Sequence, residues 1–309
     1  MALNFTTFDV FTTTAFRGNP LAIVQVPIGT ELSQNQKQLI AREFNLSETV
    51  FLHEQTAEDI QRRVARIDIF TPLAEVPFAG HPTIGTSNFL LHHLHLGSAR
   101  SLGTRAGLVP FRELHLDGEP GAQLAVAHNV HIHNRPFDGT PYSQHPIVSI
   151  VNGMTAILVR LPDLPTLGQQ RVNLVGTENT YTAKSALDEG WRNGPVVSYF
   201  YVDFEPTGTD GARRLRTRNL GLREDPATGS AAAGLCAFLS FVEGDEGGLM
   251  RRYDVVQGVE IGKKSEIRVQ VTLDEDRKGI KEVLLSGNAV KVLEGKVPVP
   301  PPELTVRPE

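Results

Sequence analysis

The sequence predicts an α+β protein built from two related halves, each a sheet around one central helix. Residues 75–90 align without a gap with residues 224–239, a separation of 149 positions (224 − 75), and six of the sixteen aligned pairs are identical. In both copies an expected strand leads through a Pro and Gly turn into small residues that are apolar on nearly every face, which indicates a buried helix. Expected strands outnumber helices elsewhere, which favours this arrangement over a doubly wound parallel sheet.

In the first half, β-branched and aromatic residues bounded by turn formers predict a hairpin of strands at 5–11 and 21–26 around Gly18-Asn19-Pro20. Residues 33–44 follow a Ser cap with apolar residues at near-helical spacing, so we expect an amphipathic helix that leads to Glu48. The rest of this half is expected to hold a strand over 64–70, a helix over 81–94 and short strands over 102–127.

In the second half, the same reasoning predicts helices at 183–191 and 230–241 and strands at 157–161, 196–203, 213–219, 252–257, 266–273 and 282–286. Pro, Asp-Gly and Asn residues over 131–145 indicate a linker. We therefore expect one domain over 1–130 and another over 131–296, with a return of the last strand to the first domain left open. A Pro-rich tail, 297–309, is expected to be frayed.

The two small-residue helices are expected to begin near Gly80-His81 and Gly229-Ser230, with Pro82 suited to a first helical position. The first backbone N–H groups of a helix have no partner within it, so each start is able to bind a carboxylate. Two starts that face each other across a cleft would form a pocket, and the repeat predicts such a pair.

Composition limits the classes of function. A chain of 309 residues that is 40% hydrophobic and 21% charged has room for two domains, and its net charge of −5 gives no general attraction to nucleic acid or anionic membranes. No apolar run approaches the roughly 20 residues that cross a bilayer, and residues 1–10 lack the pattern of a signal peptide, so we expect a cytoplasmic protein with small-molecule partners. The single cysteine, Cys236, excludes an internal disulfide and a cysteine-based metal cluster.

Three further patterns are weak. His92, His93 and His95 suggest a metal site, but neighbouring helical positions point in different directions and no carboxylates join them, so we expect no metal. The arginines of 213–218 are expected to lie on a solvated or dimer-facing strand edge rather than on a nucleic-acid stripe. Glycines over 244–248 lack the context of a phosphate loop, so no nucleotide and no other cofactor is expected.

Five motifs resemble one family when they are taken in order. They are Gly18-Asn19-Pro20, residues 45–51, Phe70-Thr71-Pro72, residues 79–83 and residues 224–231. Together they resemble the phenazine-biosynthesis isomerase (PhzF-like) family, which shares its fold with diaminopimelate epimerase, over residues 5–292. The resemblance implies a barrel-like sheet around each central helix, an active site between the domains, and a homodimer.

The resemblance also assigns roles to residues. Glu48 is implied to be the base that moves a proton between two substrate carbons, and its apolar neighbours would raise its pKa toward neutrality. His81 and Asp225 are implied to be the other catalytic residues, which hydrogen-bond the substrate or assist Glu48. Backbone and side-chain groups implied to bind the substrate belong to Asn19, Gly80, Gly229 and Ser230. The alternatives are a solvated loop glutamate for Glu48, a structural histidine for His81, a turn cap for Asp225 and ordinary helix caps for the rest.

The thiols of the related epimerases would stand just before each repeated glycine, and here Ala79 and Thr228 occupy those places. A two-base cysteine mechanism is therefore absent, and Cys236 is expected to serve packing. We expect a cofactor-independent isomerase that shifts a proton on a small carboxylate-bearing, amino-substituted substrate. The alternatives are an amino-acid racemase or epimerase that uses Glu48 and a second group, and a non-catalytic binding protein on the same fold.

Overall fold

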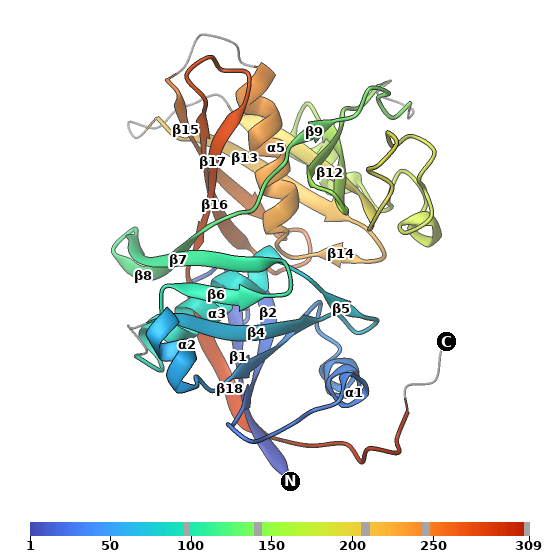
Figure 1. Cartoon of the computed structure of the whole chain (residues 1–309). Coiled ribbons are helices and arrows are strands. Elements are labelled where there is room, and N and C mark those ends of the chain that lie inside the picture. Colours follow the sequence, from blue (N-terminus) through green and yellow to red (C-terminus); the bar gives the residue numbers. More distant parts are fainter. Residues whose placement is uncertain (96–98, 139–143, 205–210, 243–247, 306–309) are drawn as a thin grey trace. The chain divides into compact units, whose positions relative to one another are not determined.

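The computed structural model describes residues 1–95, 99–138, 144–204, 211–242 and 248–305 (Figure 1). The chain forms two compact units, 1–124 together with 286–309, and 125–285. Strand β18 (Ala289–Pro298) belongs to the first unit, in which it pairs with β1 (Ala2–Val10). The division into domains at 130 and 296 stays a prediction beside these two units.

The first unit is a mixed sheet. Its remaining elements are β2 (Asn19–Val26), α1 (Gln34–Phe44), β3 (Thr49–His53), α2 (Ala57–Arg62), β4 (Val64–Phe70), β5 (Glu75–Val76), α3 (Gly80–His92), β6 (Ser101–Thr104), β7 (Gly107–Leu116) and β8 (Glu119–Ala125). β1 and β2 form the expected antiparallel hairpin, β2 runs parallel to β3, and β3 pairs antiparallel with β4. β4 then runs parallel to β6, and the antiparallel pairs β6–β7 and β7–β8 complete the order.

Helix α3 lies among these strands and contacts β1, β2, β3, β7 and β18. Every residue from Gly80 to Leu90 is buried, as the lack of a polar face predicts. Close packing explains Gly85, since a Cβ atom there would lie 2.5 Å from the Leu21 side chain. The first half is therefore a sheet around a central helix.

The second unit repeats this order. Its elements are β9 (His131–Ile132), β10 (Ile147–Val151), β11 (Met154–Arg160), α4 (Leu164–Gln169), η1 (Thr177–Asn179), β12 (Val196–Phe204), β13 (Arg213–Leu220), β14 (Glu224–Asp225), α5 (Gly229–Val242), β15 (Met250–Gln257), β16 (Ser265–Leu273) and β17 (Ile280–Gly287). β11–β12 and β13–β15 are parallel, whereas β10–β11, β12–β13 and β15–β16 are antiparallel. Helix α5 contacts β10, β11, β15 and β16 and is the central helix of this unit.

The repeat seen in the sequence is thus a repeat of structure. The parallel and antiparallel pairs follow the same sequence in both units, and α3 and α5 begin 149 positions apart (229 − 80). Both helices follow a two-residue strand that pairs with the end of the preceding long strand. The predicted class, α+β with a sheet around a central helix in each half, is confirmed.

Four expectations were wrong in detail. No helix forms over 183–191, where turns lead to Gly190 at a φ of +83°. The expected linker, 131–145, carries β9 and a bridge between Phe137 and His145. The tail is ordered as far as it is described, because Val299 N–H donates to Met1 O and Pro300 O accepts from Gln36 Nε2. Elements that were not predicted are α2, α4, η1, β3, β5, β9, β10, β14 and β18.

The arginine strand is the fourth correction. β13 is not an edge, because it lies between β12 and β15. Three of its arginines form ion pairs, namely Arg213 with Asp203, Arg216 with Glu260 and Arg218 with Glu224.

Among the described residues, no helix is long and apolar enough to cross a membrane.

Candidate active site

Glu48 and His81 lie in contact in the first unit. Nδ1 of His81 is 3.1 Å from Oε2 of Glu48, and the two side chains are only 4% and 19% exposed. A carboxylate and an imidazole at this distance share a proton readily, and the pair is largely removed from bulk water. Glu48 and His81, the two residues that the sequence proposed as catalytic in this half, therefore form a contacting pair.

Sheet pairing explains how Glu48 reaches this place. Glu48 directly precedes β3, whose first residue, Thr49, pairs with Phe70 on one side and Ala22 on the other. Because β2 and β3 are parallel, the residues before each strand lie side by side. Ser47 accordingly donates a hydrogen bond to Oδ1 of the buried Asn19, at 3.2 Å. Asn19, a predicted substrate-binding residue, is thus joined to the Glu48 segment.

His81 is positioned by the first turn of α3. The residue that precedes the helix, Ala79, has no polar side chain and supplies no cap for its first N–H groups. Nε2 of His81 is buried and has no hydrogen-bond partner among the described residues. The first N–H groups of α3, from Gly80 on, therefore receive no cap from the side chain of Ala79, and this end of the helix lies next to the Glu48 carboxylate.

A second polar group lies at the corresponding end of α5. The Thr228 hydroxyl donates to Oδ2 of Asp225 at 2.5 Å, and it accepts from Nδ2 of Asn219 at 2.7 Å and from Nε2 of Gln257 at 3.1 Å. Oε1 of Gln257 accepts from the Tyr199 hydroxyl at 2.9 Å. Tyr199 is fully buried, and burial raises the pKa of its phenol far above the ordinary value, so the hydroxyl remains a donor.

The strand that carries Asp225 is fixed by its neighbour. Glu224 receives two hydrogen bonds from Arg218, Nε to Oε1 at 2.9 Å and Nη2 to Oε2 at 2.6 Å. Nη1 of Arg218 also donates to the carbonyl oxygens of Leu167 and Gly168. Because successive side chains on a strand point to opposite faces, the clamp on Glu224 directs Asp225 toward Thr228.

The start of α5 supplies the last predicted residues. Gly229 is buried and is the first residue of the helix, and Ser230 follows it half-buried. The first helical bond joins Ala232 N–H to Thr228 O at 3.0 Å. The structure thus gathers Glu48, His81, Asn19 and Gly80 in the first unit and Asp225, Gly229 and Ser230 in the second. That the two helix starts face one cleft stays a prediction.

The two copies differ at the positions that surround the helix starts. Asn219, Asp225 and Thr228 correspond, by the offset of 149, to Phe70, Val76 and Ala79, none of which has a polar side chain. Sequence reasoning missed Asn219 and Gln257, which donate to the Thr228 hydroxyl that contacts Asp225. The available signal was a polar residue at the end of an expected strand, since Asn219 ends the strand expected at 213–219 and Gln257 ends the one expected at 252–257. In the structure Gln257 is 0% exposed.

Comparison with protein families decides the kinship of this chain. The family described as phenazine biosynthesis-like protein, PhzC-PhzF, matches residues 8–295. The chain belongs to this family. The resemblance that the five motifs suggested is confirmed over almost the whole sequence.

Curated relatives of this PhzF-like protein are named as isomerases. An uncharacterized isomerase of Pasteurella multocida is 32% identical, with 94% of this chain and 93% of the relative covered. The trans-2,3-dihydro-3-hydroxyanthranilate isomerase of Pseudomonas aeruginosa is 31% identical, with 94% and 98% covered. Both matches extend over more than nine tenths of each protein.

Solved structures agree on the fold. A PhzF-family protein of Bacillus anthracis has a TM-score of 0.75 at 22% identity, with 97% of this chain and all of that one covered. A hydroxyproline epimerase of Agrobacterium vitis, solved with bound trans-4-hydroxy-L-proline, has a TM-score of 0.64 at 16% identity, with 97% and 94% covered. The PhzF-like chain therefore has the diaminopimelate epimerase-like fold.

A histidine cluster that the sequence reasoning missed lies in the second unit of the PhzF-like chain. His131, His133 and Asp188 place possible ligand atoms within 4.8 Å of one another. Hydrogen bonds occupy both ring nitrogens of His133, since Nδ1 accepts from Asp188 N–H and Nε2 lies 3.0 Å from Ser149 Oγ. Trp191 stacks on His131 at 4.4 Å. The hydrogen bonds and the ring stacking of this cluster therefore hold residues 183–191 against β9 and the residue that follows it.

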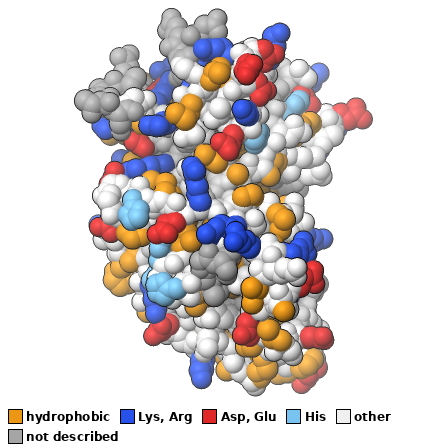
Figure 2. Space-filling model, turned by 60° about the vertical axis from the view of Figure 1, so that its left-hand side comes forward, with side chains coloured by type: hydrophobic (Ala, Val, Ile, Leu, Met, Phe, Trp, Pro, Cys, Tyr) orange, Lys and Arg blue, Asp and Glu red, His pale blue; other side chains and the backbone are white. Residues whose placement is uncertain are grey.

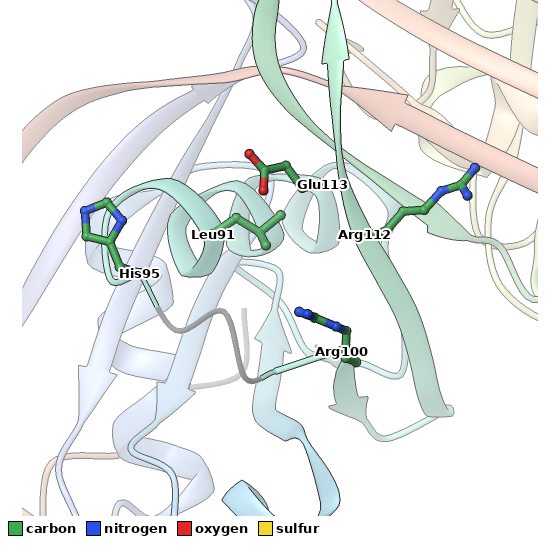
Figure 3. A pocket seen from close by; sticks show the side chains of 5 residues that line it. All are labelled: Leu91, His95, Arg100, Arg112 and Glu113. Atoms are coloured by element: carbon green, nitrogen blue, oxygen red, sulfur yellow. The ribbon is translucent and has the colours of Figure 1, made fainter.

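A pocket of about 450 Å³ lies at the other end of α3 from His81 (Figure 3). Figure 3 shows Leu91 and His95 on the helix side, Arg112 and Glu113 on β7, and Arg100 before β6. Arg112 extends away from Arg100, and its Nε donates to Gln123 at 2.7 Å. The side chains do not converge on one point, so the arrangement identifies no ligand.

On the face that Figure 2 displays, basic, acidic and apolar side chains are interspersed. His92 and His93 also point to different neighbours, because His92 Nδ1 lies 3.8 Å from Glu113 and the His93 ring packs on Phe8. Cys236 is fully buried in α5, where burial raises the pKa of its thiol, as expected for a packing residue.

Proposed function

We propose that this PhzF-like chain is a cofactor-independent isomerase that shifts a proton between two carbons of a small, carboxylate-bearing and amino-substituted substrate. The observation that carries the proposal is the contact between Glu48 and His81, at 3.1 Å and largely buried. Membership in the family and the named isomerases among its relatives support the same reaction class.

In the proposed mechanism Glu48 takes a proton from one substrate carbon and returns it to another on the same face. The carboxylate must first accept the proton and then donate it. The imidazole of His81 assists because its ring N–H is able to donate a hydrogen bond to the carboxyl group in either protonation state. Asp225 accepts a hydrogen bond from the substrate amine. The N–H groups of Gly80, Gly229 and Ser230 hold the substrate carboxylate, and Asn19 fixes the loop that carries Glu48.

The decisive variant is Glu48→Gln, because the amide keeps the size of the side chain but carries no transferable proton. Loss of a general acid/base group typically lowers the rate by about 10²- to 10⁴-fold, and substrate binding is expected to persist. Glu54→Gln is a matched control, since Glu54 lies at the far end of β3 and accepts from Ile28 N–H. Retention of more than about a tenth of the rate by Glu48→Gln would falsify this role.

The assay also separates the other two functions. In deuterated water, trans-2,3-dihydro-3-hydroxyanthranilate is expected to shift its double bond and to gain at most one deuteron, to the extent that the proton on Glu48 exchanges with solvent before it is returned. Racemisation of an amino acid without a bond shift identifies an epimerase, and tight binding without exchange identifies a binding protein. His81→Ala and Ser230→Ala are expected to weaken binding as well as turnover, in contrast to Glu48→Gln. A homodimer, which the resemblance implied, stays a prediction.

A further inference from the structure

Thr228 stands in a hydrogen-bond network in which backbone groups fix the direction of the Gln257 amide. Oε1 of Gln257 accepts from Thr228 N–H at 3.3 Å, and Nε2 of Gln257 donates to Asp225 O at 2.8 Å. A backbone N–H only donates and a carbonyl only accepts, so the two ends of the Gln257 amide are assigned without ambiguity. The Nε2 group that reaches the Thr228 hydroxyl is therefore a donor.

The hydroxyl proton of Thr228 has one remaining direction. A hydroxyl oxygen has two lone pairs, and these receive Nδ2 of Asn219 at 2.7 Å and Nε2 of Gln257 at 3.1 Å. The proton then points to Oδ2 of Asp225, at a distance of 2.5 Å. Such a separation is typical of a hydroxyl that donates to an ionised carboxylate.

We propose that Thr228 is a positioning residue that holds Asp225 in its ionised form, with the direction of its hydroxyl set by Asn219 and Gln257. This inference deepens the proposed function, in which Asp225 accepts from the substrate amine. The hydroxyl of Thr228 and the amides of Asn219 and Gln257 do not ionise at neutral pH, so the network keeps its pattern of donors and acceptors there. A purely structural network would fix the turn of residues 225–228 and leave the protonation of Asp225 unaffected.

The environment of the network supports a built arrangement. Gln257 and Thr217 are 0% exposed, and Tyr199 OH joins them by bonds of 2.9 Å to Gln257 and 3.1 Å to Thr217. Oδ1 of Asn219 is buried without a hydrogen-bond partner among the described residues, whereas both ends of the Gln257 amide are matched. An unmatched donor or acceptor at Gln257 would be costly, which favours the pattern of donors given above over its reverse. The corresponding positions of the first unit, Phe70, Val76 and Ala79, offer no such network.

The test follows the carboxyl carbon of Asp225 by NMR as a function of pH in the free protein, with Thr228→Ala and Thr228→Ser. A hydrogen bond to a charged group is lost in Thr228→Ala, so protonation of Asp225 is expected at a pH higher by about one unit or more. Thr228→Ser keeps the hydroxyl and is expected to titrate like the wild type. Asn219→Leu is expected to shift the titration in the same direction, by less.

A titration of Asp225 in Thr228→Ala that stays within about 0.3 pH units of the wild type overturns the proposal, as does an equal shift in Thr228→Ser. If Thr228→Ala does not fold, an unchanged titration in Asn219→Leu overturns it and an upward shift supports it. The NMR readout needs no turnover, so it remains valid if Glu48→Gln retains activity. The acid side of the pH profile of kcat/KM is expected to move with the same shift, because that profile reports the free enzyme.

Discussion

The Asp68 carboxylate fastens α1 to the sheet of the first unit, and its removal has a calculable cost. Oδ2 of Asp68 lies 2.8 Å from His53 Nε2 and 2.9 Å from Lys37 Nζ, and its side chain is 26% exposed. Burial alone raises the pKa of Asp68, but the hydrogen bonds and charges of His53 and Lys37 outweigh burial and lower this pKa from 3.8 to about 2.

A lowered pKa is a contribution to stability that depends on pH. The contribution of Asp68 is complete above pH 3.8 and is lost as the pH falls toward 2, because the unfolded chain binds the proton more readily. The difference of 1.8 pH units (3.8 − 2) corresponds to about 2 kcal/mol, to order of magnitude, or about 60-fold in the opening equilibrium. At pH 2.5 the same pKa values leave about 4-fold.

Hydrogen exchange of amides in β3 and β4 measures this difference locally. In Asp68→Asn these amides are expected to exchange on the order of 10- to 100-fold faster than in the wild type at pH 7, and less than about 10-fold faster at pH 2.5. Glu58→Gln is the control, because the Glu58–Arg62 pair is exposed and 3.4 Å long, so little change is expected. An equal effect of Asp68→Asn at both pH values would refute the reasoning.

Two other substitutions test how the backbone and a buried ion pair hold the candidate site. Gly18→Ala is expected to destabilise the first unit by more than about 1 kcal/mol in thermal denaturation, because Gly18 has a φ of +67° and a Cβ atom would lie 2.4 Å from Val10 O; an unchanged Tm would contradict the strain argument. Arg218→Met is expected to cost about 3–5 kcal/mol in urea unfolding followed by Trp191 fluorescence, because it leaves the Glu224 charge buried without its partner. A double change, Arg218→Met with Glu224→Leu, should recover part of this loss, and no recovery would mean that the buried charge is not the cause.

Local patterns predicted most of the fold. Ser33 accepts from Gln36 N–H and begins α1 as its cap, and β4 covers the predicted residues 64–70. These elements depend on neighbours in the chain, which a sequence displays directly. The prediction of a helix over 183–191 was wrong because the histidines that hold these turns lie in and next to β9, about fifty positions earlier. A local pattern does not show such a distant contact.

The candidate site was predictable to the extent that its residues are near in sequence to the helix starts. The repeat indicated the two helix starts, whereas the roles of Glu48, His81 and Asp225 followed from the family motifs, and Glu48 meets His81 through the parallel pairing of β2 with β3. Gln257 is 29 positions from Thr228 (257 − 228), and nothing in its local sequence indicates that its amide sets the direction of a hydroxyl. Such partners depend on tertiary pairing, which composition and periodicity do not contain.

The unequal polarity of the two copies has a consequence for how the protein arose. An ancestral unit that duplicated would have produced two identical helix starts with the same side chains. The two copies now differ at these positions, because Phe70, Val76 and Ala79 correspond in the repeat to Asn219, Asp225 and Thr228. One gene therefore carries two copies of a backbone with different side chains at the helix starts, as expected after a duplication.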